Sequence, residues 1–141
     1  MAEEKVAENR FSSRHDNLKQ RTKEFAVRVL NLVDSLPNKL SARTIGAQLA
    51  RCATSVAANY RSACRARSNA DFISKLTVVE EETDESAFWI EMLVAKDLVR
   101  PELVNELLDE ANQLTAIWVS SINTARGRKR ELRTPHSALR T

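Results

Sequence analysis

The chain has 141 residues and a formal net charge of +3, with only two glycines and three prolines. This length suits one domain with its own hydrophobic core, and the shortage of turn residues favours long helices over β-hairpins. No run of about 18 apolar residues occurs, so we expect no membrane-spanning helix, and the polar N-terminal segment does not resemble a secretory signal.

Residues 1–14 are mostly polar, and we expect them to form a disordered N-terminal segment. In the first predicted helix, apolar residues alternate at spacings of four and three, which keeps one stripe against a partner helix. The stripe consists of Leu18, Thr22, Phe25, Val29, Leu32 and Leu36. Pro37 ends this helix, and Ser41 is the expected N-cap of the second.

The next three helices show the same alternation. The second carries Ile45, Leu49, Cys52, Val56, Asn59 and Ala63. The third follows a cap at Ser68 or Asn69 and carries Phe72, Leu76, Val79, Thr83, Ala87, Ile90 and Val94. The fourth has Pro101 in its first turn and carries Leu103, Leu107, Ala111, Leu114, Trp118 and either Ser121 or Ile122. Four helices with short connections predict an all-α, antiparallel up-down-up-down bundle over residues 15–125.

Two helices have more small or apolar residues than a lone bundle needs. The second has a stripe of small residues, and the third has apolar residues nearly opposite its seam. Such extra faces predict self-association. The candidate interface residues are Gly46, Ala50, Ala53, Ala57, Val78, Trp89 and Leu93.

Asn59 is a polar residue in an otherwise apolar seam. It can fix helix register and oligomer state, it can form a hydrogen bond to a carboxylate of the third helix, or it can contact a ligand. Glu80, Asp84 and Glu91 flank the seam of that third helix, and structural pairing is favoured over catalysis for them. In this interpretation Asn59→Ala strands a buried partner and costs on the order of 1–3 kcal/mol.

The sequence contains no recognisable catalytic set. Its histidines, His15 and His136, lie in the ends expected to be disordered, and no helix carries the Glu-x-x-His motif of di-iron bundles. No nucleophile–base pair or phosphate-binding glycine loop occurs. We therefore expect no catalytic, cofactor-binding or metal-binding residues, and no enzymatic activity. Cys52 and Cys64, roughly 18 Å apart on one helix, cannot pair and indicate a reducing cytoplasm.

Residues 126–141 contain six of the 22 basic residues and one acidic residue, so this segment has a charge of +5 and the rest of the chain −2. The helix-breaking Gly127 lies at the start of this segment, and we expect a disordered tail that attracts polyanions. The candidate nucleic-acid contacts are first Arg126, Arg128, Lys129, Arg130 and Arg133, and second Arg61 and Arg65. The second helix also carries Arg43 and Arg51 on the same side as Arg61 and Arg65. This stripe either faces phosphates or neutralises acids of the third helix.

Two longer patterns are specific. The first is QLxRxAxSVxANYRxAxRARSxxxFxxKL from Gln48 to Leu76, and the second is EEExDExxFWxEML from Glu80 to Leu93. Over roughly residues 18–124 the chain resembles the four-helix-bundle proteins whose founding members are encoded in intervening sequences of bacterial 23S ribosomal RNA genes. The resemblance implies a homopentamer and no catalytic residue. Related proteins are accessory subunits of diversity-generating retroelements, where they bind a reverse transcriptase and nucleic acid.

The sequence thus predicts a cytoplasmic, non-enzymatic, homo-oligomeric bundle. Its expected partners are further copies of itself and RNA or DNA, or a nucleic-acid-handling protein to which it is an accessory subunit. The alternative is a protein–protein scaffold without affinity for nucleic acid.

Overall fold

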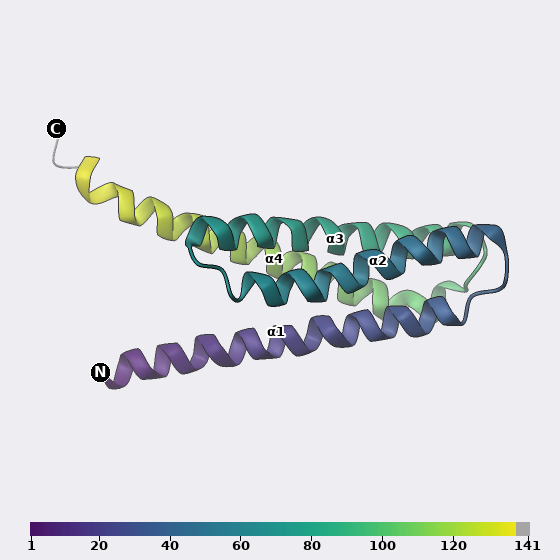
Figure 1. Ribbon diagram of the computed structural model, residues 1–141, viewed down its shortest axis with the longest axis horizontal. Coiled ribbons are helices and arrows are strands. Elements are labelled where there is room, and N and C mark those ends of the chain that lie inside the picture. The colour runs from purple at the N-terminus through teal and green to yellow at the C-terminus, as the bar shows by residue number, and fades with distance from the viewer. Residues whose placement is uncertain (138–141) are drawn as a thin grey trace.

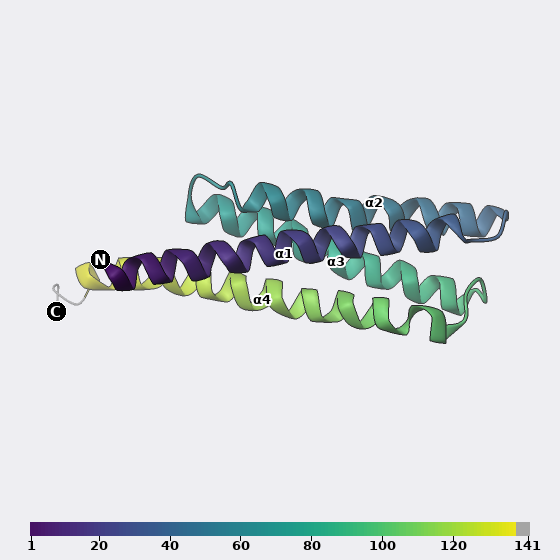
Figure 2. The same cartoon turned by 90° about the horizontal axis from the view of Figure 1, so that it is seen from below.

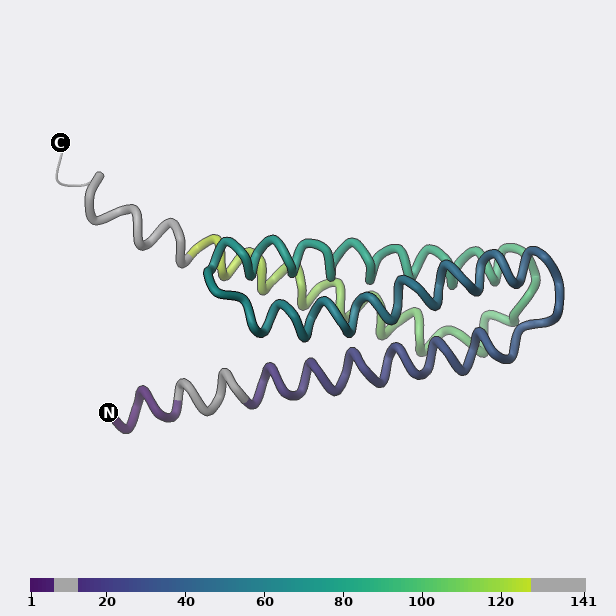
Figure 3. Tube along the Cα trace, viewed as in Figure 1, coloured from purple at the N-terminus to yellow at the C-terminus, as the bar shows by residue number. Residues whose placement is uncertain are grey.

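Helix-forming residues dominate the chain between three short connections, and the computed structural model is an antiparallel bundle of four helices (Figure 1). These are α1 (Ala2–Asp34), α2 (Leu40–Ala63), α3 (Asn69–Ala95) and α4 (Pro101–Ser137). The structure describes the backbone of residues 1–137 and the side chains of residues 1–6 and 13–127; Figure 3 draws the other residues in grey. The predicted all-α fold and the four-helix bundle are confirmed.

The helices follow one another in an up-down-up-down order, as Figures 1 and 2 show from two directions. The α2–α3 interface is the most extensive and the α1–α4 interface the least. The start of α1, the end of α4 and the α2–α3 connection lie at one end of the bundle, and the other two connections lie at the opposite end. None of the helices in the described part of the chain is both long and apolar enough to cross a membrane.

The core follows the predicted seams. Its largest fully buried side chains include Phe25, Leu49, Leu76, Ile90 and Trp118. Three buried hydroxyl residues, Thr22, Thr83 and Ser86, satisfy their hydroxyls by donating to the carbonyl oxygen four residues earlier, at 2.7–2.8 Å. Within the described side chains, no buried polar atom is left without a hydrogen-bond partner. The core of the bundle is therefore mostly apolar, and the few polar groups that it buries all form hydrogen bonds.

The seam predictions were wrong by one residue at two positions. Asn59 is only half-buried, and the neighbouring Tyr60 is buried with 2% of its surface exposed. Leu103 is 65% exposed, whereas Val104 is buried. In both cases a step of three and a step of four residues from the adjacent seam residue fit the helical period equally well. Packing against the other helices decides between them.

The helix ends also differ from the prediction. Ser68 is the N-cap of α3, as one of the two predicted alternatives, and its side chain accepts from the Asp71 N–H at 3.0 Å. The N-cap of α2 is Lys39, so Ser41 lies within the first turn. Residues 2–14 belong to α1, and α4 continues past Gly127 to Ser137, although both stretches were expected to be disordered. Alanine and glutamate are frequent in the first stretch and arginine is frequent in the second, and all three are strong helix formers.

Candidate functional site

The end of the bundle that carries the α2–α3 connection is rich in arginine. We call it the basic end and define it by Arg14, Arg61, Arg65, Arg67 and Arg126. All five side chains are exposed, and none forms an ion pair with another described residue. The acidic residues Asp16 and Asp71 nearby are paired with lysines, at 3.8 Å and 3.2 Å respectively.

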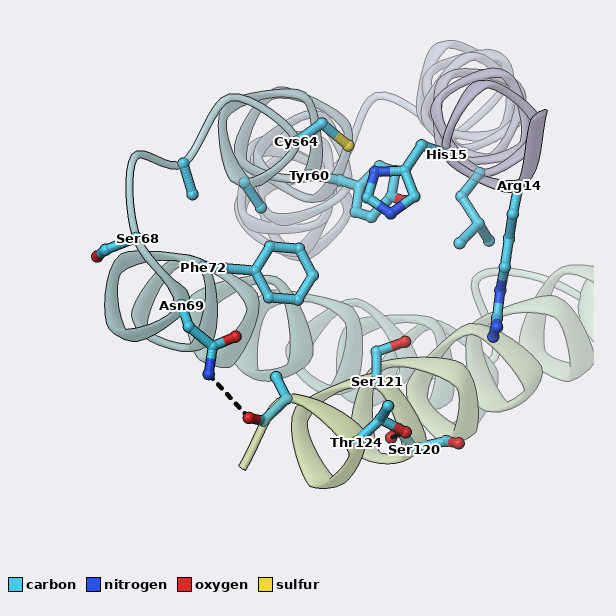
Figure 4. A pocket seen from close by; sticks show the side chains of 14 residues that line it. Arg14, His15, Tyr60, Cys64, Ser68, Asn69, Phe72, Ser120, Ser121 and Thr124 are labelled. Carbon is cyan, nitrogen blue, oxygen red and sulfur yellow. Dashed lines mark hydrogen bonds between the residues drawn. The ribbon is translucent and has the colours of Figure 1, made fainter. Parts of the chain in front are cut away.

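One hydrogen bond ties together the two most basic stretches of the chain. The Asn69 side-chain amide donates to the carbonyl oxygen of Ala125 at 2.8 Å (Figure 4). Asn69 directly follows the Arg65–Ser68 connection, and Ala125 directly precedes Arg126. The fold therefore places the arginines around the α2–α3 connection beside the start of the basic C-terminal segment. The side chains of Arg128, Lys129, Arg130 and Arg133 lie outside the described residues.

A pocket of about 360 Å³ opens at the basic end and is lined by all four helices. Arg14 and His15 come from α1, Tyr60 from α2, Phe72 from α3 and Ser121 from α4, and Figure 4 shows these side chains around one space. The His15 and Phe72 rings are nearly parallel, with an interplanar angle of 16° and centroids 6.4 Å apart. Beneath them, the Tyr60 ring lies 4.9 Å from the Trp118 ring and joins the pocket to the core.

Burial sets the protonation of the pocket residues. It lowers the pKa of the His15 imidazole, and the positive charges of Lys19 and Arg14 lower this pKa further. Burial also raises the pKa values of the Tyr60 hydroxyl and the Cys64 thiol. At neutral pH the pocket thus holds a neutral imidazole, a neutral phenol and a neutral thiol, with Arg14 as the cation among its lining residues.

A second cluster of titratable side chains lies between α2 and α3. The Arg51 guanidinium contacts the Glu82 carboxylate at 3.3 Å and the Glu85 carboxylate at 2.9 Å. The possible ligand atoms of Cys52, Glu82 and Glu85 lie within 4.8 Å of one another. Burial raises the pKa of the Cys52 thiol to about 12, however, and metals bind the thiolate. The Arg51 guanidinium pairs with both carboxylates, so this cluster has the character of an ion-pair network between two helices.

The network also explains the ionisation of Glu85. Burial tends to raise the pKa of its carboxyl, but hydrogen bonds from Trp89, Cys52 and Arg51 outweigh it, and the pKa is lower than usual. Of the two roles considered for the arginine stripe on α2, Arg51 has the neutralising one. Arg43 donates to the side-chain oxygen of Asn38, while Arg61 and Arg65 belong to the basic end.

The structure contradicts the partners predicted for the polar seam residues. The Asn59 amide donates to the backbone carbonyl of Ser55 at 2.9 Å and to the Ser55 hydroxyl at 2.8 Å, both on its own helix. Glu80 is half-buried, and Asp84 and Glu91 are exposed. Asn59 does not reach a carboxylate of α3 because it points away from the core, where Tyr60 takes the inner position.

The predicted interface residues divide into two groups. Leu93 and Ala53 are fully buried within the single chain, and Gly46 is buried where an added Cβ would lie 3.2 Å from Leu36 and from Val33. These three are core residues of the single chain, and at Gly46 the missing side chain makes room for α1. The residues that retain exposed surface are Ala50, Ala57, Val78 and Trp89, beside the 49% exposed Phe88.

The hydrophobic period of the sequence does not predict the pocket. His15 was assigned to the disordered N-terminal segment, and Phe72 and Asn69 were assigned structural roles only. Extending the first seam backwards by three residues from Leu18 reaches His15, and this spacing is the signal that could have placed the imidazole at the core.

Comparison with known proteins agrees with the fold. The model of the 23S rRNA-intervening sequence protein family matches residues 14–120. The crystal structure of a protein of unknown function from the S23 ribosomal protein family of Bacteroides thetaiotaomicron is 31% identical, with a TM-score of 0.72, over 77% of this chain and 97% of that one. No curated protein matches the chain. The family resemblance predicted from the sequence is confirmed, and the chain belongs to the 23S rRNA-intervening sequence protein family.

Proposed function

We propose that this protein is a non-enzymatic, homo-oligomeric bundle that binds RNA or DNA through its basic end. The observation that carries the proposal is the Asn69–Ala125 hydrogen bond, which joins the arginine-rich α2–α3 connection to the start of the basic tail. Two stretches that are far apart in the sequence thereby form one positive surface. A phosphate backbone is bound mainly by such clustered, sequence-independent positive charge.

The ion pairs of the bundle support this choice of surface. Arg21 and Arg51 are held by carboxylates of α4 and α3, so they connect helices. The arginines of the basic end have no described acidic partner, so their charge is available to phosphates. The family name adds a link to intervening sequences of 23S rRNA.

Self-association would strengthen this surface. Val78 and Phe88 on α3 and Val27 on α1 are exposed by 39–49%, which leaves apolar area for contact with further copies. The family resemblance implies five copies. A closed ring with cyclic symmetry turns the same surface of every copy in the same direction along its axis, so that five basic ends act together. Free Cys52 and Cys64 fit a cytoplasmic location, where thiols stay reduced.

The test is titration of short single-stranded RNA and duplex DNA with the oligomer at about 50 mM and about 200 mM salt. Three variants are compared. The first replaces Arg61, Arg65 and Arg67 by glutamine, and the second replaces Arg128, Lys129, Arg130 and Arg133. The third is a matched control at the opposite end of the bundle, with Arg28, Lys39 and Arg100 replaced.

Wild type should bind more weakly as salt rises, because counterions are released from the phosphates. The slope of log K against log salt is negative, and the first variant should reduce its magnitude by about three. The second variant should reduce the magnitude of this slope by a similar amount. The control variant should bind like wild type. Wild type that does not bind at low salt would contradict the proposal, and light scattering that shows a monomer would contradict self-association.

A scaffold without nucleic-acid affinity is the second candidate. The exposed Leu103 and Phe88 favour it, because both offer apolar surface away from the basic end. Absence of binding to either nucleic acid, together with a stable oligomer, would select this function.

A further inference from the structure

The charged residues of α2 and α3 are separated by sign. α2 contains three arginines and no acidic residue, whereas residues 76–95 of α3 contain six acidic residues and no basic residue. Within one chain, Arg51 of α2 pairs with Glu82 and Glu85 of α3. The other acidic residues of this part of α3 have no such partner among the described residues, so the two helices keep opposite charges that the single chain does not neutralise.

The outer face of α3 combines negative charge with apolar surface. Glu81, Asp84 and Glu91 are exposed and form no ion pair with another described residue. Val78 and Phe88 lie among them, with 39% and 49% of their surfaces exposed. We call these five residues the acidic face. Like charges on one helix surface repel each other, and the aromatic ring adds apolar area that the single chain leaves uncovered.

The outer face of α2 has the opposite character. Arg43 is exposed, and although it donates to the Asn38 side chain, it forms no ion pair with another described residue. On the same side of the helix follow Ala47, Thr54 and Ala57, which are small and keep exposed surface. We call these residues of α2, with Arg43, the α2 face. Apart from the arginine it carries no large side chain, so a second helix can approach it closely.

The pairing of Arg51 shows which residues of the two helices lie at the same height along the bundle. Arg51 lies level with the turn between Glu82 and Glu85, and the two helices run antiparallel side by side (Figure 1). Equal numbers of residues counted from this level, backwards along α2 and forwards along α3, cover equal heights, because each residue adds about 1.5 Å. The level pairs are Arg43 with Glu91, Ala47 with Phe88, and Ala57 with Val78.

A second copy of the chain can use these level pairs. Rotation about an axis parallel to the bundle keeps every residue at its height, so the acidic face of one copy meets the α2 face of the next in this register. Glu91 then lies opposite Arg43, and the Phe88 ring lies opposite Ala47. Charge and side-chain size are thus complementary at the same heights.

We propose that the acidic face of α3 docks on the α2 face of a second copy of this chain, in a head-to-tail contact around an axis parallel to the bundle. α2 and α3 occupy neighbouring corners of the bundle, so the two faces point in different directions and one copy can contact two others. A contact between two acidic faces would instead bring like charges together. The inference rests on the self-association in the proposed function and names its surfaces, and it turns every basic end in the same direction.

The first experiment blocks each face separately in the full chain. Phe88→Glu places a further negative charge in the acidic face, and Ala47→Glu places a large acidic side chain in the α2 face. Both positions are exposed, so both variants should keep the helicity of wild type by circular dichroism. Each should raise the concentration at which half of the protein is assembled by at least about 10-fold, measured by light scattering. Leu103→Glu, at a 65% exposed position on α4, is the matched control and should assemble like wild type.

Mixing the two blocked variants tests the head-to-tail contact. Phe88→Glu keeps an intact α2 face and Ala47→Glu keeps an intact acidic face, so an equimolar mixture should form a one-to-one dimer and nothing larger. Charge exchange tests the register. Glu91→Arg and Arg43→Glu should each weaken assembly, and the double variant should recover it, because the exchanged pair forms again between copies.

The results separate this inference from nucleic-acid binding, which the salt titration measures at the basic end. If Phe88→Glu and Ala47→Glu assemble like wild type, the assignment of the two faces is overturned while self-association stands. Dissociated variants that form no dimer on mixing would overturn the head-to-tail contact. A double charge variant that is weaker than both single variants would overturn the register. Wild type that is a monomer at micromolar concentration would overturn the inference as a whole.

Discussion

The middle of the bundle and its basic end are built from the same four helices, yet one is closed and the other is open. In the middle, the fully buried Trp118 donates its indole N–H to the Thr83 hydroxyl at 3.0 Å, and that hydroxyl donates to the Val79 carbonyl at 2.7 Å. One to two turns further along α4, Ile122 still packs into the core, but the small side chains of Ser121 and Ala125, with Ala63 of α2, line a pocket. The difference lies in side-chain volume rather than in backbone geometry.

This difference shows how a simple bundle can hold a site without a loop of its own. Large seam residues such as Leu76, Ile90 and Trp118 are fully buried in the middle. Small residues at the basic end leave part of the space unfilled, and this space is the pocket. The closed region supplies the stability, and the open region would be the binding surface under the proposed function.

The closed region should respond most strongly to truncation. Trp118→Ala removes the largest fully buried side chain and should lower the free energy of unfolding by about 3–5 kcal/mol, through the cavity and the lost hydrogen bond to Thr83. Urea denaturation measures the loss. Val119→Ala, at the neighbouring position with 41% exposure, should cost less than about 0.5 kcal/mol. Similar losses for both variants would show that the middle of the bundle is not its tightest part.

Among the described side chains, one ion pair joins α1 to α4, on the side of Trp118 that faces away from the basic end. The Arg21 Nε lies 3.1 Å from both Glu110 carboxylate oxygens, and Nη2 contacts Glu110 and also Gln113, the latter at 3.0 Å. The side chains of Arg21 and Glu110 are only 29% and 18% exposed. Toward the other end, a second hollow of about 330 Å³ separates α1 from α4, beside Leu32 and Leu107. The pair thus clamps two helices that pack loosely elsewhere.

Arg21→Met should therefore lower the free energy of unfolding by about 1 kcal/mol, because it leaves a half-buried carboxylate without its donor. The double variant Arg21→Met with Glu110→Met should lose less than the sum of the single variants, and this non-additivity measures the coupling. Lys19→Met removes an exposed pair with Asp16 and should change stability by less than about 0.5 kcal/mol. Strict additivity of the two single variants would show that the clamp has no energetic role.

The sequence predicted the closed region well because hydrophobic period determines it. Spacings of three and four residues place Leu49, Leu76, Leu114 and Trp118 on the buried face of their helices, regardless of which helices pack against that face. The same rule fails where both spacings fit. From Val56, a step of three reaches Asn59 and a step of four reaches Tyr60. Only the ring packing of Tyr60 against Trp118 decides between them.

The open region could not be predicted in the same way. The pocket depends on four helix ends that meet in space, and on the continuation of α1 back through His15. The hydrophobic period of a sequence shows which side chains face the core, but it does not show where those side chains leave a cavity. The candidate interface shows the converse error, since Leu93 lies off the centre of the α3 seam but is fully buried within the single chain.

The smallest expected effect concerns Asn59. The sequence-based interpretation gave it a buried carboxylate partner and a cost on the order of 1–3 kcal/mol for Asn59→Ala. In the structure its amide donates only to the Ser55 carbonyl and hydroxyl of its own helix, so truncation strands no group on α3. Alanine also has a higher helix propensity than asparagine, which offsets the lost local bonds.

Asn59→Ala should therefore shift the free energy of unfolding by less than about 0.5 kcal/mol. Tyr60→Ala, at the next residue, removes a ring that is buried against Trp118 and should lower the free energy of unfolding several times more. Thermal or urea unfolding of the two variants side by side is the measurement. A loss above about 2 kcal/mol for Asn59→Ala would mean that the asparagine, and not the tyrosine, occupies the inner position.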